Sequence, residues 1–306
     1  MQPMIFDTSK SITQKIESDE LHQRGISLYV KRDDLIHPEV SGNKWRKLKY
    51  NFEQFKLSKK EQILTFGGAY SNHLLAVASA CQLNGIPSIA IVRGEELTEK
   101  SNDLLSKCAS LGMQLHFISR MEYGMRNDKE YLEEISIDFP NSYIIPEGGA
   151  NYLGIIGCQQ ILNEVEVSID HVFVAQGTTT TSCGILLNSN FKKLHVVPVM
   201  KGFDSKQEMS SLYKKTGFES AIISELLEKV IFHLDHHFGG YGKYTSELID
   251  FIKSVGEKMQ LPLDKIYTGK AFFALMNEIQ RGNLDNQNLL FIHTGGLHTS
   301  VNQLDQ

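Results

Sequence analysis

The stretch QILTFGGAYSNHLLAVASACQLNG, Gln62–Gly85, contains one strand pattern and one helix pattern, and it decides the fold class. Its first seven residues form an apolar, β-rich run that ends in a glycine pair, which predicts a buried strand followed by a turn. Beyond the turn, Ser71 or Asn72 can cap a helix, and the apolar segment that follows closes at Gly85. The stretch is therefore a predicted strand–helix unit.

The same alternation continues through most of the chain. The predicted strands are QILTFGG (62–68), PSIAIVRG (87–94), MQLHFIS (113–119), SYIIPEGG (142–149), HVFVAQG (171–177), LHVVPVM (194–200) and LLFIHTGG (289–296). Helical patterns lie between them, for example NDLLSKCASLG, which begins at an Asn cap and ends at Gly112. Such alternation implies an α/β fold with a mostly parallel sheet covered by helices on both faces. Because no linker is evident, a second domain is expected as an insertion.

Composition limits the classes of function. The chain has 306 residues, 41% of them hydrophobic, and a formal charge of −5 with both signs interspersed, which argues against a nucleic-acid partner. No apolar stretch approaches the roughly 18 residues of a membrane span, and the first residues lack a signal-peptide pattern, so we expect a cytoplasmic protein. The four cysteines are far apart and are expected to be buried thiols: Cys81, Cys108, Cys158 and Cys183.

Glycine pairs end three of the predicted strands, at Gly67-Gly68, Gly148-Gly149 and Gly295-Gly296. In open α/β sheets, ligands bind beyond the carboxyl ends of the strands, and glycines there let backbone amides approach an anion. The alternative is that any turn from strand to helix needs glycine. Three pairs together favour binding.

A threonine-rich segment, AQGTTTTSCGILL, runs from Ala175 to Leu187 between a predicted strand and a predicted helix. Backbone amides at a helix start and small hydroxyl side chains suit a phosphate group. The segment lacks the Gly-Lys-Ser/Thr ending of a P-loop and the G-x-G-x-x-G pattern of a dinucleotide site. It predicts a phosphate cradle, with a plain threonine-rich turn as the alternative.

A basic cluster, SGNKWRKLKY, spans residues 41–50. A lysine that forms a Schiff base must lose its proton, which a desolvated site and neighbouring positive charge both favour. If a helix begins here, Lys44 and Lys47 share one face, so that one could reach an aldehyde and the other its phosphate. The alternative is a solvated, basic helix start.

Six motifs in order resemble one family, the D-cysteine desulfhydrases and 1-aminocyclopropane-1-carboxylate deaminases. They are KRDDL (31–35), SGNKWRKL (41–48), GGAYSNH (67–73), PEGGANYLGIIG (146–157), YTGKAF (267–272) and IHTGG (292–296). The resemblance implies a pyridoxal-phosphate enzyme of the tryptophan-synthase-β fold, fold type II, with two open and mostly parallel sheets. It implies a large cofactor-binding domain over residues 1–47 and 156–306, and a small inserted α/β domain over residues 48–155.

Carried over by position, the resemblance implies that Lys44 is the Schiff-base lysine and that Lys47 contacts the phosphate. Asn72 would hold the phenolic oxygen of the cofactor. Ser71 would act in catalysis and lie at the substrate carboxylate together with Asn72. His73 completes the substrate motif, although a hydrogen-bonded helix histidine is the plainer interpretation.

The phosphate cup would comprise Gly177, Thr178, Thr179, Thr180 and Thr181, which depart from the glycine-richer version typical of the family. For this reason the location of the cup is better determined than its geometry.

Tyr241 and Tyr267 resemble the two active-site tyrosines of the family, with aromatic packing as the alternative for each. The segment near Tyr241 also contains His233, Asp235, His236 and His237. A metal-dependent hydrolase would depend on this cluster alone. Because consecutive histidines cannot easily bind one ion from a strand, no metal is expected.

The substrate is indicated by two further positions that the resemblance places at the cofactor, Thr268 and Thr294. A carboxylate at position 268 would keep the pyridine ring protonated, as opening a cyclopropane requires, and a hydroxyl holds that proton less firmly. Leucine is usual at position 294 in the ring-opening branch. Both threonines resemble the desulfhydrase branch.

The resemblance therefore implies elimination from D-cysteine or a related β-substituted D-amino acid, with Lys44 as the base that removes the α-proton. The products would be pyruvate, ammonia and hydrogen sulfide. The alternatives are deamination of 1-aminocyclopropane-1-carboxylate and a non-catalytic phosphate-binding protein. A nicotinamide oxidoreductase would lack its glycine signature. The expected partners are a small amino-acid substrate and a second copy of the chain in a homodimer, with neither nucleic acid nor membrane.

Overall fold

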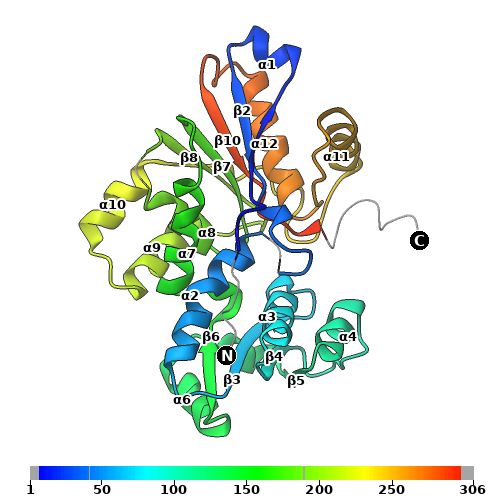
Figure 1. Ribbon diagram of the computed structural model, residues 1–306, viewed down its shortest axis with the longest axis vertical. Coiled ribbons are helices and arrows are strands. Elements are labelled where there is room, and N and C mark those ends of the chain that lie inside the picture. The colour runs from blue at the N-terminus through cyan, green and yellow to red at the C-terminus, as the bar shows by residue number, and fades with distance from the viewer. Residues whose placement is uncertain (1–6, 41, 189, 298–306) are drawn as a thin grey trace. The chain divides into compact units, whose positions relative to one another are not determined.

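The computed structural model describes residues 7–40, 42–188 and 190–297, and within them the chain divides by contacts into two units (Figure 1). The smaller unit contains Pro38–Val40 and Lys44–Gly157. The larger unit contains Asp7–His37, residues 42 and 43, and the chain from Cys158 onward. The domain boundaries predicted at residues 48 and 155 stay a prediction, and Ser41, the first residue of one motif, lies outside the described residues.

The sheet of the smaller unit is entirely parallel, with the strand order β5-β4-β3-β6. Its strands are β3 (Gln62–Gly68), β4 (Ser88–Arg93), β5 (Met113–Ile118) and β6 (Ser142–Ile145). In register, Ile63 of the central strand β3 pairs with Ser88 on one side and with Tyr143 on the other. The two inner strands β3 and β4 are buried along nearly their whole length, as is usual for parallel strands covered on both faces.

The helices of the smaller unit pack on this sheet. They are α3 (Asn72–Leu83), α4 (Asp103–Ser110), α5 (Arg120–Gly124) and α6 (Lys129–Asp138), with a 3-10 turn η2 (Glu147–Gly149). Helix α3 contacts β3 and β4, and α4 contacts α3 and β5. Tyr123 of α5 and Ile135 of α6 pack with Phe66 and Ile91 in one apolar cluster. Helices α2 (Asn43–Leu57) and α7 (Tyr152–Asn163) each contain residues of both units.

The larger unit has a mixed sheet with the strand order β1-β2-β10-β7-β8-β9. Its strands are β1 (Thr13–Ile16), β2 (Ser27–Lys31), β7 (His171–Gln176), β8 (Lys193–Pro198), β9 (Val230–Phe232) and β10 (Asn288–Ile292). The edge pair β1 and β2 is antiparallel, and the other pairs are parallel. The last strand in sequence, β10, therefore lies between β2 and β7.

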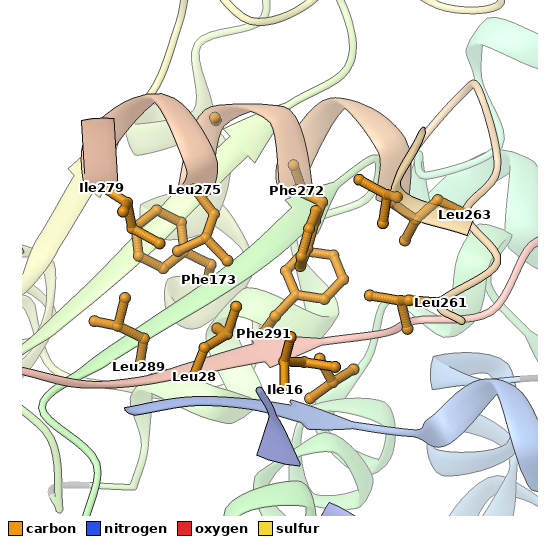
Figure 2. Close-up of a cluster of buried hydrophobic side chains, with 14 of the residues drawn as sticks. Ile16, Leu28, Phe173, Leu261, Leu263, Phe272, Leu275, Ile279, Leu289 and Phe291 are labelled. Carbon is orange, nitrogen blue, oxygen red and sulfur yellow. The ribbon is translucent and has the colours of Figure 1, made fainter. Parts of the chain in front are cut away.

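Helices and a large apolar core complete this unit. The elements are α1 (Asp19–Gln23), η1 (Asp33–Leu35), α8 (Thr180–Leu186), α9 (Ser205–Lys215), α10 (Ser220–Glu228), α11 (Ser246–Met259) and α12 (Thr268–Gln280). Figure 2 shows α12 lying over the sheet, with Phe272 and Leu275 pointing toward Phe173 and Phe291 of the strands. The rings of Phe272 and Phe291 meet edge to face, with centroids 5.0 Å apart. This packing fixes the start of α12 at the carboxyl ends of the strands.

The predicted α/β fold with two mostly parallel sheets covered by helices is confirmed. All seven predicted strands are present, whereas β1, β2 and β9 were missed. The four cysteines are buried and form no disulfide among the described residues, as predicted. Among the described residues, no helix is long and apolar enough to cross a membrane.

Candidate active site

Helix α2 begins directly after a tight backbone contact. Gly42 has a φ of +61°, and a Cβ atom there would lie 1.9 Å from the carbonyl oxygen of Thr294. That carbonyl accepts a hydrogen bond from the backbone amide of Asn43 at 3.3 Å. From this start the helix buries Trp45, Leu48, Phe52 and Phe55, which share one face. The predicted helix over the basic cluster is therefore present.

Lys44 and Lys47 lie in the first turns of α2. Lys47 is buried and Lys44 is half-buried. A Cβ atom on Gly149 would approach the Cβ atom of Lys47 to 3.0 Å, so the backbone of the glycine pair after β6 lies directly against this lysine. The glycine pair thus leaves room for the Lys47 side chain and does not merely turn the chain.

His73, in the first turn of α3, is buried and neutral. Burial, and then the charges of Lys44 and Lys47, hold the pKa of His73 well below its usual value. The hydroxyl of Thr65 donates to the carbonyl of Ile145 at 2.8 Å, and it lies 2.9 Å from His73 Nε2. Because that hydroxyl has one proton and gives it to a carbonyl, His73 Nε2 must be the donor. The bare Nδ1 atom is buried without a hydrogen-bond partner among the described residues.

Ser71 and Asn72 form the start of α3. Ser71 is the N-cap residue with extended backbone, and its side chain makes no capping hydrogen bond. Its carbonyl accepts from the amide of Leu74 at 3.0 Å. The preceding loop is fixed by Asn102, whose side chain donates to the carbonyl of Ala69 at 3.1 Å. A helix start that no side chain caps suits an anion.

The threonine segment turns from β7 into α8. Thr179, Thr180 and Thr181 are buried, and the Thr180 hydroxyl has no hydrogen-bond partner in the described part of the chain. Asn43 donates to the Thr181 hydroxyl at 2.9 Å. A Cβ atom on Gly177 would lie 2.9 Å from the Tyr267 ring. The turn is thus shaped by its neighbours, and at least one buried hydroxyl is left for a ligand.

A buried carboxylate caps the start of α12, and this cap was not predicted from the sequence. Buried Asp264 accepts hydrogen bonds from the backbone amides of Ile266, Tyr267 and Thr268 at 2.6–2.8 Å. It also accepts from the Thr268 hydroxyl at 2.5 Å, and its own amide donates to that hydroxyl at 2.9 Å. The single hydroxyl proton of Thr268 is therefore used in its hydrogen bond to Asp264. An Asp shortly before a helix was the signal that could have indicated this cap.

The two predicted tyrosines lie together. The hydroxyl of Tyr267 lies 3.4 Å from that of Tyr241, and their rings meet edge to face with centroids 6.0 Å apart. Tyr241 is 47% exposed. Tyr241 therefore stays partly exposed to solvent in this packing.

The histidine cluster near Tyr241 has a different organisation from a metal site. His233 Nε2 lies 2.9 Å from His195 Nδ1, and His195 Nε2 lies 2.9 Å from His171 Nδ1. The rings of His195 and Phe173 stack with centroids 4.0 Å apart. No group of three or more His, Cys, Asp or Glu residues within the described ranges is arranged to hold a metal ion. The histidines instead join strands β7 and β8 to the residue that follows β9.

Two family-like motifs have structural partners. In KRDDL, Arg32 donates twice to Asp34, at 2.9 and 2.7 Å. In IHTGG, His293 Nε2 donates to the carbonyl of Pro262 at 2.6 Å. The first contact is internal to the segment that follows β2, and the second fixes the segment before α12 to the residue that follows β10.

The predicted residues fall into two groups. The first, in the smaller unit, contains Lys44, Lys47, Ser71, Asn72 and His73. The second, in the larger unit, contains Gly177, Thr178, Thr179, Thr180, Thr181, Tyr241, Tyr267, Thr268 and Thr294. Within the first group the two lysines lie near His73, and within the second the tyrosines lie together and Gly177 lies against Tyr267.

Comparison with known families decides the class. The family model described as "Pyridoxal-phosphate dependent enzyme" matches residues 8–295. The chain belongs to this family. It is an enzyme that depends on pyridoxal phosphate.

Three similar proteins point to one branch of the pyridoxal-phosphate enzymes. A Pyrococcus abyssi protein named "Putative 1-aminocyclopropane-1-carboxylate deaminase" is 34% identical over 287 residues, which cover 89% of this chain and 85% of that protein. The Arabidopsis thaliana mitochondrial bifunctional D-cysteine desulfhydrase/1-aminocyclopropane-1-carboxylate deaminase is 30% identical, over 92% and 75% of the two chains. A crystal structure of an ACC deaminase homologue superimposes with a TM-score of 0.76 and 28% identity, over 95% and 90% of the two chains.

The residues of this chain fit the cofactor. Pyridoxal phosphate offers an aldehyde, a phenolic oxygen and a phosphate, which call for an amine, a polar side chain and several hydrogen-bond donors. Lys44 and Lys47 supply amines, and the start of α3 supplies backbone amides without a side-chain cap. The unpartnered hydroxyl of Thr180 supplies a buried donor beside Asn43 and Thr181. The part of Asn43 in holding this turn was not predicted from the sequence.

Proposed function

We propose that this enzyme catalyses α,β-elimination of D-cysteine, or of a related β-substituted D-amino acid, to pyruvate, ammonia and hydrogen sulfide. When bound, pyridoxal phosphate supplies an electron sink that stabilises negative charge at the substrate α-carbon. The work of the protein is to hold this group, to orient the substrate and to move the α-proton.

In this proposal the residues have the roles in cofactor binding that the resemblance implies. Lys44 holds the aldehyde carbon, Lys47 the phosphate, and Asn72 the phenolic oxygen. The turn from Gly177 through Thr178, Thr179 and Thr180 to Thr181 receives the phosphate, with Thr294 beside the cofactor. Support comes from the buried Thr180 hydroxyl, which has no hydrogen-bond partner among the described residues and needs one.

The substrate carboxylate is assigned to the start of α3. Ser71 and Asn72 offer a hydroxyl, an amide side chain and a helix start that no side chain caps, all suited to an anion. Lys44, which would hold the cofactor aldehyde, would also be the general base that takes up the substrate α-proton. Tyr241 and Tyr267 border the substrate with their hydroxyl groups.

The presence of Thr268 favours elimination of a β-leaving group over opening of a cyclopropane ring. In the proposal this residue faces the ring nitrogen of the cofactor. The Thr268 hydroxyl donates a hydrogen bond to Asp264. Thr268 therefore offers the ring nitrogen only an oxygen lone pair, whereas a carboxylate would offer a full negative charge. Such a group keeps the ring protonated less firmly than a carboxylate does. A weaker sink suffices to expel a thiolate, which is a good leaving group.

Deamination of 1-aminocyclopropane-1-carboxylate is the second candidate. It is favoured by the names of the relatives in Pyrococcus abyssi and Arabidopsis thaliana, the second of which names both activities. The two reactions give different products, 2-oxobutyrate from the cyclopropane and pyruvate with sulfide from cysteine. A homodimer and a cytoplasmic location complete the proposal.

The test measures keto-acid release by the cofactor-loaded enzyme with D-cysteine, L-cysteine and 1-aminocyclopropane-1-carboxylate at matched concentrations. We expect pyruvate and sulfide from D-cysteine at a rate at least about tenfold above either other substrate, a discrimination worth about 1.4 kcal/mol. Faster release of 2-oxobutyrate from the cyclopropane would overturn the substrate assignment and leave the cofactor chemistry intact.

A matched pair of lysine variants tests the site. Lys44→Ala is expected to lower turnover at least about a thousandfold, because it removes both the cofactor-holding amine and the base. Lys56→Ala, an exposed lysine on the same helix, is expected to leave turnover unchanged. Borohydride reduction followed by peptide mass spectrometry should find the cofactor attached at Lys44. Attachment at another lysine would contradict the assignment.

A further inference from the structure

The segment that presents Tyr241 is a loop with unusual backbone geometry. Residues 237–243 form two successive turns, in which the amide of Gly240 donates to the carbonyl of His237 at 3.0 Å and the amide of Lys243 donates to the carbonyl of Gly240 at 3.2 Å. The left-handed φ region is occupied four times, by Phe238, Gly239, Gly240 and Gly242. A loop with three glycines in this region has many alternative conformations. Its own turns therefore determine the position of Tyr241 only weakly.

Lys270 lies beneath this loop. The residue sits in the first turn of α12 and is fully buried. Its ammonium group donates to the carbonyl of His237 at 2.8 Å and to the carbonyl of Gly240 at 2.9 Å. These are the same two carbonyls that close the turns. Each of the two oxygens thus accepts one hydrogen from a turn amide and one from Lys270.

Burying the charged ammonium group of Lys270 costs desolvation free energy, which its hydrogen bonds must offset. Burial lowers the pKa of Lys270 to about 8, against an opposing influence from Asp264. Its hydrogen-bond partners are neutral carbonyls, so the charge is not cancelled by a direct ion pair. An apolar side chain of similar length would avoid the desolvation cost. An apolar side chain, however, could not donate hydrogen bonds to the carbonyls of the two turns.

The start of α12 connects Lys270 to the tyrosines. Tyr267 and Lys270 are three residues apart, and Asp264 fixes this first turn through three backbone amides. Tyr267 meets Tyr241 hydroxyl to hydroxyl at 3.4 Å. One rigid helix start therefore supplies both the ring against which Tyr241 packs and the cation that holds the loop of Tyr241.

We infer that Lys270 is a positioning residue, which fixes the loop 237–243 through two backbone carbonyls and thereby holds the Tyr241 hydroxyl beside that of Tyr267. The inference deepens the proposed function and rests on it in one respect, the assignment of Tyr241 to the active site. The hold on the loop itself is a property of the protein without any ligand.

The loop is tested first, by amide hydrogen exchange of the cofactor-free protein. Lys270→Met is expected to raise exchange at Gly240 and Lys243 at least about tenfold, because the carbonyls lose their common donor. Lys270→Arg retains charge and donors and should restore much of the protection. Lys243→Met, an exposed lysine in the loop itself, is the matched control and should leave the exchange of Gly240 unchanged. Unchanged exchange in Lys270→Met would overturn the inference.

Kinetics of the loaded enzyme then separate the positioning role from the proposed function. We expect Lys270→Met to lower kcat about tenfold, and Tyr241→Phe to lower it similarly. If Lys270 acts through Tyr241, the double variant is no slower than Tyr241→Phe alone. Additive losses would contradict action through Tyr241. Full activity of Tyr241→Phe together with a loosened loop would remove Tyr241 from the proposed active site and leave the positioning role standing.

Global unfolding is distinguished from loosening of the loop by the amides of β7 and β10, which should keep their protection in every variant. Should Lys270→Met not fold, Lys270→Gln takes its place, because its shorter amide cannot span both carbonyls as the lysine does. Wild-type exchange at Gly240 in that variant would equally overturn the inference.

Discussion

The starts of helices α3 and α12 differ in how their polar groups are hydrogen-bonded. At the start of α3, the Ser71 side chain makes no capping bond and His73 Nδ1 has no partner among the described residues. At the start of α12, Asp264 takes three backbone amides and a hydroxyl, and His195 on the neighbouring strand β8 has a bond at each ring nitrogen. The open region coincides with residues proposed to bind substrate. The closed region is expected to contribute stability.

The largest expected difference concerns the two helix starts. Asp264→Ala should lower the free energy of unfolding by about 4 kcal/mol, since the cap is lost and several buried donors are left unpaired. Ser71→Ala should change it by less than about 0.5 kcal/mol, because the serine side chain makes no capping bond. Urea unfolding of the cofactor-free proteins measures both, with the exposed Asp250→Ala as control. Equal losses in the two variants would break the comparison.

Acid should lower the free energy of unfolding because His195 and His233 are buried in the neutral form. Burial lowers the pKa of His195 to about 2 and that of His233 to about 4, whereas an unfolded histidine titrates near 6.5. The unfolded chain therefore binds more protons below pH 6.5, and stability that is complete above that pH is lost as the pH falls. At pH 5.5 the loss is about 1.4 kcal/mol for each histidine.

The measurement is urea unfolding between pH 7.5 and 5. His195→Gln should reduce the loss of stability at pH 5.5 by about 1.4 kcal/mol, and His22→Gln, which replaces an exposed histidine, serves as control. If the pH dependence of His195→Gln equalled that of the wild type, these rings would not be the groups that titrate.

Ser71 should matter for turnover where it does not matter for stability. Loss of a hydrogen bond to a charged substrate carboxylate is worth about 1.4 kcal/mol, so Ser71→Ala should lower kcat/KM about tenfold, chiefly through KM. Steady-state kinetics with D-cysteine measure the effect, and Ser110→Ala on the exposed side of α4 serves as control. An unchanged KM would separate the open helix start from substrate binding.

The sequence predicted the parts of the fold that depend on long apolar patterns. Seven strands were found because each is a mostly apolar, β-rich run. The missed strands lie in less regular contexts. Strand β9 has three residues at one sheet edge, and β1 at the other edge has the sequence TQKI, in which three of the four residues are polar. Short edge strands are specified by their neighbours, which a local pattern does not contain.

At the site, sequence reasoning found motifs but not their internal partners. Lys44 and Lys47 were indicated by their spacing, and the helix that positions them is present. Asp264 and Lys270 were missed because in sequence they are ordinary charged residues. Their roles depend on backbone groups at 266–268 and 237–240, which only the folded chain brings within hydrogen-bond distance. His73 was judged a hydrogen-bonded helix histidine, and this is true of one of its two nitrogens.

The smallest expected effect concerns the proton of His73. Long-range proton–nitrogen NMR of histidine-labelled protein should show His73 protonated at Nε2 and bare at Nδ1, and unchanged as the pH falls below 6.5, because burial and the two lysines oppose its protonation. In Thr65→Val the ring loses its only hydrogen-bond acceptor among the described residues, so a population protonated at Nδ1 should appear. Turnover should fall less than about threefold, since the ring stays neutral and Lys44 keeps its place. If wild-type His73 were protonated at Nδ1, the side of the ring near the two lysines would be a hydrogen-bond donor. The described arrangement, with a bare Nδ1, would then be wrong.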